Sequence, residues 1–113
     1  MKALSGCLAL LLLAMVAPQA RAQTVTFSGY ATTVPASGLN QPYDVAVDSA
    51  GDVYIANTRG NTVVEVTAAG VASVVNVGSP GGTALNYPDG VAVDGAGDVY
   101  IADTDNSRVV EVT

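Results

Sequence analysis

Short runs of apolar residues, separated by turns rich in glycine, aspartate, asparagine and proline, dominate the chain after residue 22. The runs Val45–Val47, Val53–Ala56 and Val63–Val66 are β-branched or aromatic, which is typical of short β-strands. A fourth run, Val71–Val77, follows the turn at Ala69-Gly70, and the pattern then returns after a loop. No segment in this part of the chain has the 3.6-residue period of an amphipathic helix. We therefore expect an all-β fold.

The most informative feature of the sequence is an internal repeat. Residues 39–67 align without a gap with residues 85–113, at an offset of 46 residues, and twenty of the 29 paired positions are identical. The shared blocks are Leu-Asn-x-Pro, Val-Ala-Val-Asp, Ala-Gly-Asp-Val-Tyr-Ile-Ala and Val-Val-Glu-Val-Thr. Four short strands in each repeat are typical of one β-propeller blade, a four-stranded antiparallel sheet repeated about an axis. The pattern predicts two such blades in residues 23–113, with repeat cores at 39–67 and 85–113 and fourth strands near 25–28 and 71–77.

The second repeat carries a longer motif over Leu85–Val110, Leu-Asn-x-Pro-x-x-Val-Ala-Val-Asp-x-x-Gly-Asp-Val-Tyr-Ile-Ala-Asp-Thr-x-Asn-x-Arg-Val-Val. This motif resembles the NHL repeat, whose members usually form six-bladed β-propellers. The first repeat departs from it at Asn57, Gly60 and Thr62, where the pattern prefers Asp, Asn and Arg. The chain is similar to the extracellular sensor domain of certain bacterial serine/threonine kinases, and to many secreted bacterial proteins with NHL arrays. The resemblance implies two blades of a six-bladed propeller.

The first 22 residues have the pattern of a secretory signal peptide. They contain a basic start at Lys2, an unbroken apolar run over Leu8–Val16, and a small-x-small cleavage site at Ala20-Arg21-Ala22. The apolar run is much shorter than the ~20 residues of a membrane-spanning helix, so we expect no membrane span. Cys7 lies before the apolar run, which is the wrong order for lipoprotein acylation. The sequence predicts a secreted protein, extracellular or periplasmic, that begins at Gln23 after cleavage.

Charge and composition exclude several classes of function. The chain has ten Asp and Glu residues against four Lys and Arg residues, with no basic cluster, so nucleic acid is not an expected partner. It has no histidine, which removes the commonest general base and metal ligand. Its one cysteine lies in the leader, so no cysteine nucleophile remains after cleavage. We expect no catalytic residue, no metal and no cofactor.

One enzymatic alternative stays open. Six-bladed relatives include lactonases and lyases that hold Ca²⁺ or Zn²⁺ near the axis, and a Ca²⁺-dependent propeller enzyme, of which this chain is a fragment, needs no histidine. Asp89, Asp103, Asp105 and Asn106 bring oxygen ligands together, although their spacing matches no EF-hand loop. The remaining repeated acids have structural explanations as turn caps, solvated turn residues or outward-facing strand residues: Asp48, Asp94, Asp52, Asp98, Glu65 and Glu111.

A binding surface is expected where the loops of the blades gather. The turns Asn57–Asn61 and Asp103–Ser107 and the loops 35–42 and 78–88 fall at the same end of the blades, and exposed loops often carry function. The side chains expected to reach a protein or carbohydrate ligand there are Tyr43, Arg59, Tyr87, Asp105 and Arg108. For Arg108 the resemblance also implies a structural role, as the family arginine that braces neighbouring blades. Two further tyrosines lie inside strands and are expected to pack in the core or between blades: Tyr54 and Tyr100.

Two blades cannot close a propeller ring, which needs four to eight. An isolated pair would also expose apolar sheet faces and the strand edge at Val109–Val112. Two solutions are open: a cyclic homotrimer, in which the Val25–Ser28 strand of each chain completes the last sheet of its neighbour, or a longer array of which this chain is a fragment. The sequence therefore predicts a secreted, non-catalytic binding or scaffold module, a partial β-propeller that presents a loop face to its ligand.

Overall fold

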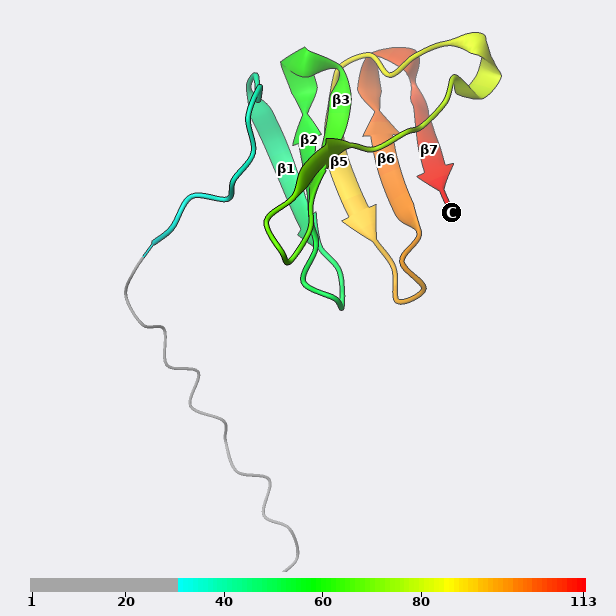
Figure 1. The fold of residues 1–113 in the computed structure, drawn as a ribbon. Coiled ribbons are helices and arrows are strands. Elements are labelled where there is room, and N and C mark those ends of the chain that lie inside the picture. The colour runs from blue at the N-terminus through cyan, green and yellow to red at the C-terminus, as the bar shows by residue number, and fades with distance from the viewer. Residues whose placement is uncertain (1–30) are drawn as a thin grey trace, which may run out of the picture. The chain divides into compact units, whose positions relative to one another are not determined.

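The computed structural model describes residues 31–113, which form two antiparallel β-sheets and no α-helix (Figure 1). The first sheet contains β1 (Pro42–Val47), β2 (Val53–Asn57), β3 (Thr62–Val66) and β4 (Ala72–Val74). The second sheet contains β5 (Pro88–Val93), β6 (Val99–Asp103) and β7 (Arg108–Val112), and in both sheets each strand pairs with the next along the chain. The expected all-β fold is confirmed. The predicted signal peptide (1–22) and the strand expected near 25–28 lie outside the described residues.

One aspartate builds the turn between the first two strands of each sheet. Asp48 Oδ1 accepts hydrogen bonds from two backbone N–H groups of its turn, both at 2.9 Å. Asp94 Oδ1 accepts the equivalent pair at 2.9 and 3.0 Å. Gly51 and Gly97 complete these turns with φ of +92° and +95°, a conformation that a residue with a Cβ rarely adopts. The two aspartates are turn caps, as the sequence predicts.

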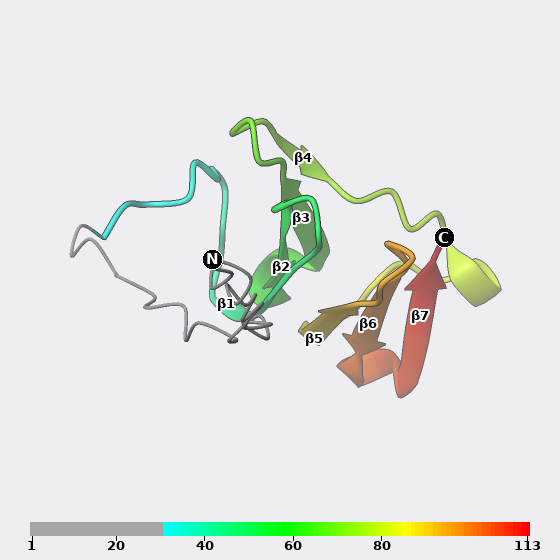
Figure 2. The same ribbon diagram turned by 90° about the horizontal axis from the view of Figure 1, so that it is seen from below.

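The two sheets pack against each other, and β5 lies beside β1 and β2 (Figure 2). We call the side of each sheet that bears Tyr54, Ala56 and Val63, or their equivalents 46 residues later, its leading face. The opposite side, which bears Val91 and Ile101 in the second sheet, is the trailing face. The leading face of the first sheet packs on the trailing face of the second, and together with Leu85, Val99 and Val110 these residues form the main hydrophobic core. Burial of this apolar surface is the principal stabilising contribution.

Hydrogen bonds also cross between the sheets, and they join side chains of the first repeat to the backbone of the second. Three are formed: Thr58 Oγ1 donates to the Pro88 carbonyl (2.7 Å), the Val91 N–H donates to Asp44 Oδ2 (2.9 Å), and the Tyr87 N–H donates to Asn61 Oδ1 (2.8 Å). Residues 32–113 therefore form one compact unit with a polar as well as an apolar interface between its sheets.

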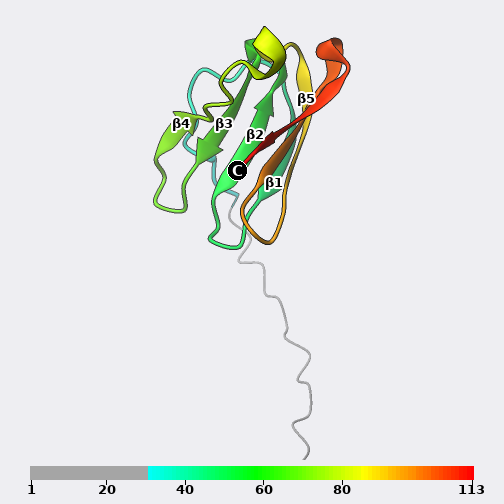
Figure 3. The same cartoon turned by 90° about the vertical axis from the view of Figure 1, so that its right-hand side faces the viewer.

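The structure differs from the sequence expectation at the outer strands. β4 covers only three residues of the expected 71–77, at the edge of the first sheet beside β3 (Figure 3). Within residues 31–113 the second sheet has three strands and β7 has no partner on its outer edge, while the other fourth strand, expected near 25–28, lies outside the described residues. Asp52 is more than a solvated turn residue, because its Oδ1 accepts the Ala68 N–H at 2.7 Å and links two turns of the first sheet.

Candidate functional site

The two repeats meet at a pocket of about 270 Å³ at the end of the sheets where β1 and β5 begin. Each repeat contributes four residues to its lining, at matching positions 46 residues apart. The lining residues are Gln41, Tyr43, Thr58 and Arg59 from the first repeat, and Tyr87, Asp89, Thr104 and Asp105 from the second. The pocket therefore belongs to the junction between the repeats and not to either repeat alone.

Local backbone geometry directs these side chains to the junction. The pairing register shifts between Pro42 and Asp44 and again at the equivalent place in β5, so Tyr43 is an extra residue with no partner on β2. Tyr87 has φ of +50°, a left-handed conformation that is uncommon for a bulky side chain. Its N–H is held by Asn61 of the first repeat at 2.8 Å. Such a conformation persists only where surrounding contacts stabilise it, and these positions are often functional.

The adjoining turns are fixed in the same way in both repeats. The short 3₁₀ turns η2 (Thr58–Gly60) and η4 (Thr104–Asn106) carry the lining residues that follow β2 and β6. The Arg59 N–H donates to the Asn40 carbonyl, and the Asp105 N–H donates to the Asn86 carbonyl, both at 3.1 Å. These bonds bring each turn against the loop that precedes its sheet, so the predicted placement of both loop types at one end is confirmed.

Some of the lining side chains are engaged and others are free to meet a ligand. The Thr58 hydroxyl is buried and donates to the backbone of β5, and the Thr104 hydroxyl donates to Asp89 Oδ1. Five others are exposed, and within residues 31–113 their side chains make no hydrogen bond or ion pair: Gln41, Tyr43, Arg59, Tyr87 and Asp105. The last four are predicted ligand-binding residues, and the structure brings them to one pocket.

The free groups combine aromatic surface with charge of both signs. Arg59 enters from the first repeat and Asp105 from the second, whereas Asp89 also lines the pocket but accepts the Thr104 hydroxyl. Tyrosine rings can pack on the apolar face of a ligand while their hydroxyl groups hydrogen-bond its polar edge. A guanidinium donates several hydrogen bonds and a carboxylate accepts them. Such a lining suits a small group that carries several hydroxyl, amide or charged substituents. Among residues 31–113, no group of three or more His, Cys, Asp or Glu side chains is arranged to hold a metal ion.

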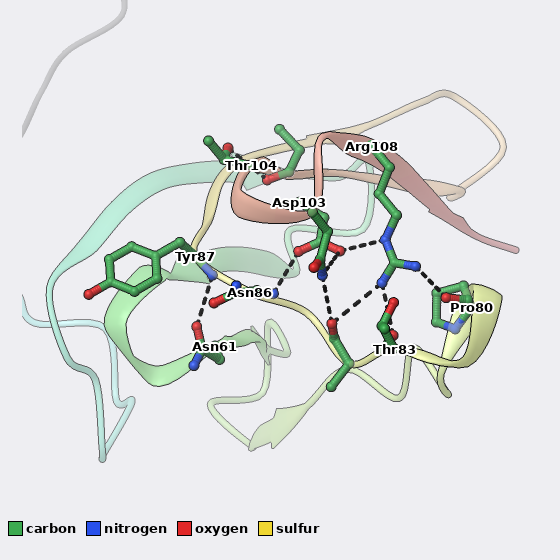
Figure 4. A network of polar contacts seen from close by, with 11 residues as sticks. Asn61, Pro80, Thr83, Asn86, Tyr87, Asp103, Thr104 and Arg108 are labelled. Carbon is green, nitrogen blue, oxygen red and sulfur yellow. Dashed lines mark hydrogen bonds and ion pairs between the residues drawn. The ribbon is translucent and has the colours of Figure 1, made fainter.

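Arg108, the fifth predicted ligand-binding residue, lies outside this pocket in a network of its own (Figure 4). Its Nε donates to Asp103 Oδ2 at 2.6 Å, and its terminal nitrogens donate to carbonyl groups in the loop 80–84. Asp103 also accepts the Asn86 N–H at 2.7 Å and the Asn106 amide at 2.8 Å. Arg108 thus braces the second sheet against the loop that precedes it. The family resemblance implies that this arginine braces neighbouring blades. In the structure its bonds instead stay within the second sheet and the loop before it.

The Asp103 carboxyl is ionised within this network. Burial by itself raises the pKa of Asp103, but hydrogen bonds from the Asn86 N–H, the Asn106 amide and the Arg108 guanidinium together lower it below its usual value. The first repeat solves the same structural problem without charge, because Asn57 and Thr62 stand at the equivalent positions. Asn57 Oδ1 accepts the Asn40 N–H at 2.6 Å, and its Nδ2 donates to Thr62 Oγ1 at 3.0 Å. Asp103 is therefore committed to structure, which removes it from the oxygen ligands considered for Ca²⁺.

The strand tyrosines are confirmed as packing residues in the first sheet but not fully in the second. Tyr54 is buried in the main core, and its hydroxyl donates to Glu65 Oε1 at 3.2 Å. Tyr100 makes the equivalent bond to Glu111 at 3.1 Å but is only half-buried. Burial, and then the Glu65 carboxylate, raise the pKa of Tyr54 to about 12. The hydrogen bond to Glu111 is the main reason why the pKa of Tyr100 is also raised to about 12.

Three lining residues are not among those predicted from the sequence: Gln41, Thr58 and Thr104. The repeat itself contained the signal that could have found them. Gln41 is the equivalent of Tyr87, and the two threonines are equivalents of each other beside Arg59 and Asp105. Asp89, the equivalent of Tyr43, was expected only as a possible calcium ligand. Applying the 46-residue offset to each predicted residue would have given six of the eight positions, all except the threonine pair.

Comparison with known proteins supports the motif on which the sequence interpretation depends. Residues 85–111 match the family described as NHL repeat. This segment contains β5, β6 and most of β7, together with the second repeat's share of the pocket. A search of curated proteins finds no match. In the part of the chain that the structure describes, no helix is long and apolar enough to cross a membrane.

Proposed function

We propose that this chain is a secreted, non-catalytic binding or scaffold module, formed by two NHL-type blades of a β-propeller, whose ligand occupies the pocket between the repeats. The observation that carries this proposal is the convergence of Tyr43, Arg59, Tyr87 and Asp105, all exposed and unengaged, on one pocket at the loop end of the sheets. A binding function needs only such a preformed surface, and pockets of this kind commonly form where structural units meet.

The pattern of identity between the repeats supports a binding role for the pocket. Positions that build strands and turns are mostly identical in the two repeats, as twenty of 29 are overall. Of the four pairs that line the pocket, three differ, and only the threonine pair is identical. The differing pairs are Gln41 and Tyr87, Tyr43 and Asp89, and Arg59 and Asp105. A surface with no role beyond folding has no reason to concentrate its differences there, whereas an asymmetric ligand requires different groups on its two sides.

The size and chemistry of the pocket favour a carbohydrate ligand over a protein surface. At about 270 Å³ it lies just below the range of drug-sized sites, so one sugar ring or one side chain is the unit that it accommodates. Tyr43 is 70% exposed and Tyr87 is 41% exposed, so both rings are available for stacking on the apolar face of a sugar. The adjacent Arg59 and Asp105 supply hydrogen bonds for its hydroxyl groups. Secretion, extracellular or periplasmic, follows from the leader pattern of residues 1–22 and matches a ligand of this kind.

Isothermal titration calorimetry of the full chain tests the proposal with defined probes: glucose, galactose, mannose, fucose, N-acetylglucosamine and a set of short charged peptides. We expect at least one sugar to bind, and a Tyr43→Ala plus Tyr87→Ala variant to bind it about tenfold or more weakly, since stacking of this kind contributes ~1.4 kcal/mol or more. Tyr100→Phe is the matched control, because Tyr100 lies outside the pocket. Binding by peptides alone would assign the pocket to a protein ligand. The absence of binding by any probe, or equal binding by the double variant, would contradict the proposal.

A further inference from the structure

The contact between the two sheets provides a template for a second contact of the same kind. One half of the existing contact is the leading face of the first sheet. It bears Val63, which is 0% exposed because the second sheet covers it. The trailing half is the face of the second sheet that bears Val91, which is 6% exposed. Each half recurs elsewhere in the molecule, because the repeats place the same residue types at the same positions.

The leading half recurs, uncovered, on the second sheet. Val109 is the equivalent of Val63, and its side chain is 69% exposed. Together with Gly90, Tyr100 and Ala102 it lines a shallow hollow on this face. Tyr100 and Ala102 are identical to the core residues of the first sheet but are only half-buried here. This face therefore has the composition of a packed interface without its partner.

The trailing half recurs, partly uncovered, on the first sheet. Val45 and Val47 are 59% and 60% exposed, although their equivalents in β5 pack against the main core. Ile55 lies on the same face and is buried in a second, smaller core, against which Ala36 and Leu39 pack. The open part of this face is therefore the side near β1. In the second sheet the equivalent side is formed by β5, and β5 is the strand that packs against the first sheet.

We propose that the leading face of the second sheet in one copy of the chain packs on the trailing face of the first sheet in another copy, head to tail. This proposal is independent of the pocket ligand. The two surfaces differ, so the contact is heterologous, and repeating it gives either a closed ring or an open filament. Propellers have four to eight blades, so two-blade copies close a ring with two, three or four members. A ring of two, three or four copies is therefore the expected species.

The polar groups at the new contact are fewer than in the template. Thr104 retains the hydroxyl with which Thr58 reaches the Pro88 carbonyl, and its counterpart in the next copy is the Pro42 carbonyl. Gly90, however, stands at the position of Asp44, so the hydrogen bond from that carboxylate has no equivalent. The contact between copies is therefore weaker than the contact within a copy, and the assembly should dissociate on dilution before the chain unfolds.

Mass measurement by light scattering during size-exclusion chromatography, over a range of concentrations of the full chain, tests the proposal. Two variants each disable one face: Val109→Asp the leading face and Val45→Asp the trailing face. Both valines are more than half exposed in a single copy, so neither substitution should unfold it, and circular dichroism checks this. Val71→Asp is the matched control. Val71 belongs to the first repeat and is 62% exposed in the structure, in which the two sheets are already packed together. Its position therefore lies outside the contact between sheets.

The expected results follow from the head-to-tail geometry. The unmodified chain and Val71→Asp should form a species of two, three or four chain masses that dissociates on dilution, and each face variant alone should be a folded monomer. An equimolar mixture of the two face variants should stop at a 1:1 dimer, because it contains one intact leading face and one intact trailing face per pair. A monomeric unmodified chain at all concentrations, undiminished assembly of either face variant, or a mixture that stays monomeric would each overturn the proposal.

Discussion

Replacing Asp103 by asparagine changes one atom at the centre of the network that joins the second sheet to its preceding loop. Asp103 is fully buried, and its Oδ2 accepts hydrogen bonds from Arg108 Nε at 2.6 Å and from Asn106 Nδ2 at 2.8 Å. Asparagine can keep the bond from the Asn86 N–H through its oxygen, but its NH₂ group then faces two donors. The substitution preserves volume and removes both charge and acceptor, so its effect reports on the network and not on packing.

The expected loss of stability follows from what each partner retains. Removing one partner of a buried ion pair typically costs ~3–5 kcal/mol, because the other charge is left uncompensated. Here the Arg108 side chain is 23% exposed and keeps hydrogen bonds to loop carbonyl groups, so part of that cost is relieved. We expect Asp103→Asn to lower the free energy of unfolding by ~2–4 kcal/mol. The depressed pKa of Asp103 gives this contribution a pH dependence: it is present above the unfolded pKa near ~3.9 and lost as the pH falls through the lower folded value.

The first repeat supplies the rescue for this variant. There the equivalent pair is Asn57 and Thr62, joined by a hydrogen bond of 3.0 Å. The double variant Asp103→Asn with Arg108→Thr rebuilds that pair in the second repeat and removes the uncompensated guanidinium. We expect the double variant to be more stable than the sum of the two single effects by ~1–3 kcal/mol.

Urea unfolding of the full chain, followed by far-ultraviolet circular dichroism, measures all four members of this cycle. Should Asp103→Asn alone be unfolded in buffer, recovery of a cooperative transition in the double variant is the readout. The reasoning fails if Asp103→Asn lies within 0.5 kcal/mol of the unmodified chain, or if the two single effects are additive.

Three further outcomes are expected. At a concentration where the chain is monomeric, Thr58→Val should cost ~1–3 kcal/mol in thermal unfolding because it removes the buried hydrogen bond to the Pro88 carbonyl. Thr104→Val, at the exposed equivalent position, should stay within ~0.5 kcal/mol, and equal effects would contradict the burial difference. Tyr54 and Tyr100 should ionise near pH 12 in an absorbance titration. Because their folded pKa values are raised, their stabilising effect should be complete below about pH 10 and lost as the pH rises through about 12; ionisation of both near the ordinary tyrosine pKa of about 10 would refute this. For a binding module without a metal, melting should be unchanged by Ca²⁺ or by a chelator, and a higher melting temperature in Ca²⁺ would favour the enzymatic alternative.

The strands and turns could be predicted from the sequence because each is specified locally. Runs of β-branched residues give the strands, and an aspartate followed three residues later by glycine gives the turn at Asp48 and again at Asp94. The repeat then shows which segments are equivalent without any structural information. The length of β4 was less predictable, because pairing beyond Val74 depends on how the long connection 75–87 leaves the sheet. No short-range pattern specifies that path.

The pocket was largely predictable, whereas the role of Arg108 was not. Arg59, Tyr87 and Asp105 lie in loops or turns that the repeat places at one end, and Tyr43 lies at the start of β1 at the same end, so their convergence follows from the topology. Arg108 lies next to the same turn in sequence, and its identity alone suits either a ligand or a brace. The deciding contacts are with backbone carbonyls about 24 to 28 residues earlier in the chain, which no residue pattern near Arg108 indicates. Its buried partner Asp103, five residues away, was the one available sign of a structural role.

Direct contact between the two repeats is the premise of both the pocket and the assembly, and methyl NMR measures it most directly. In the structure Val63 of the first sheet belongs to one buried cluster with Leu85, Val91, Ile101 and Val110 of the second repeat. The nuclear Overhauser spectrum of the full chain should therefore contain cross-peaks between the methyl groups of Val63 and those of the second repeat, at concentrations where the chain is monomeric. Cross-peaks confined to each repeat alone would contradict the side-by-side arrangement of the two sheets, and with it the junction pocket.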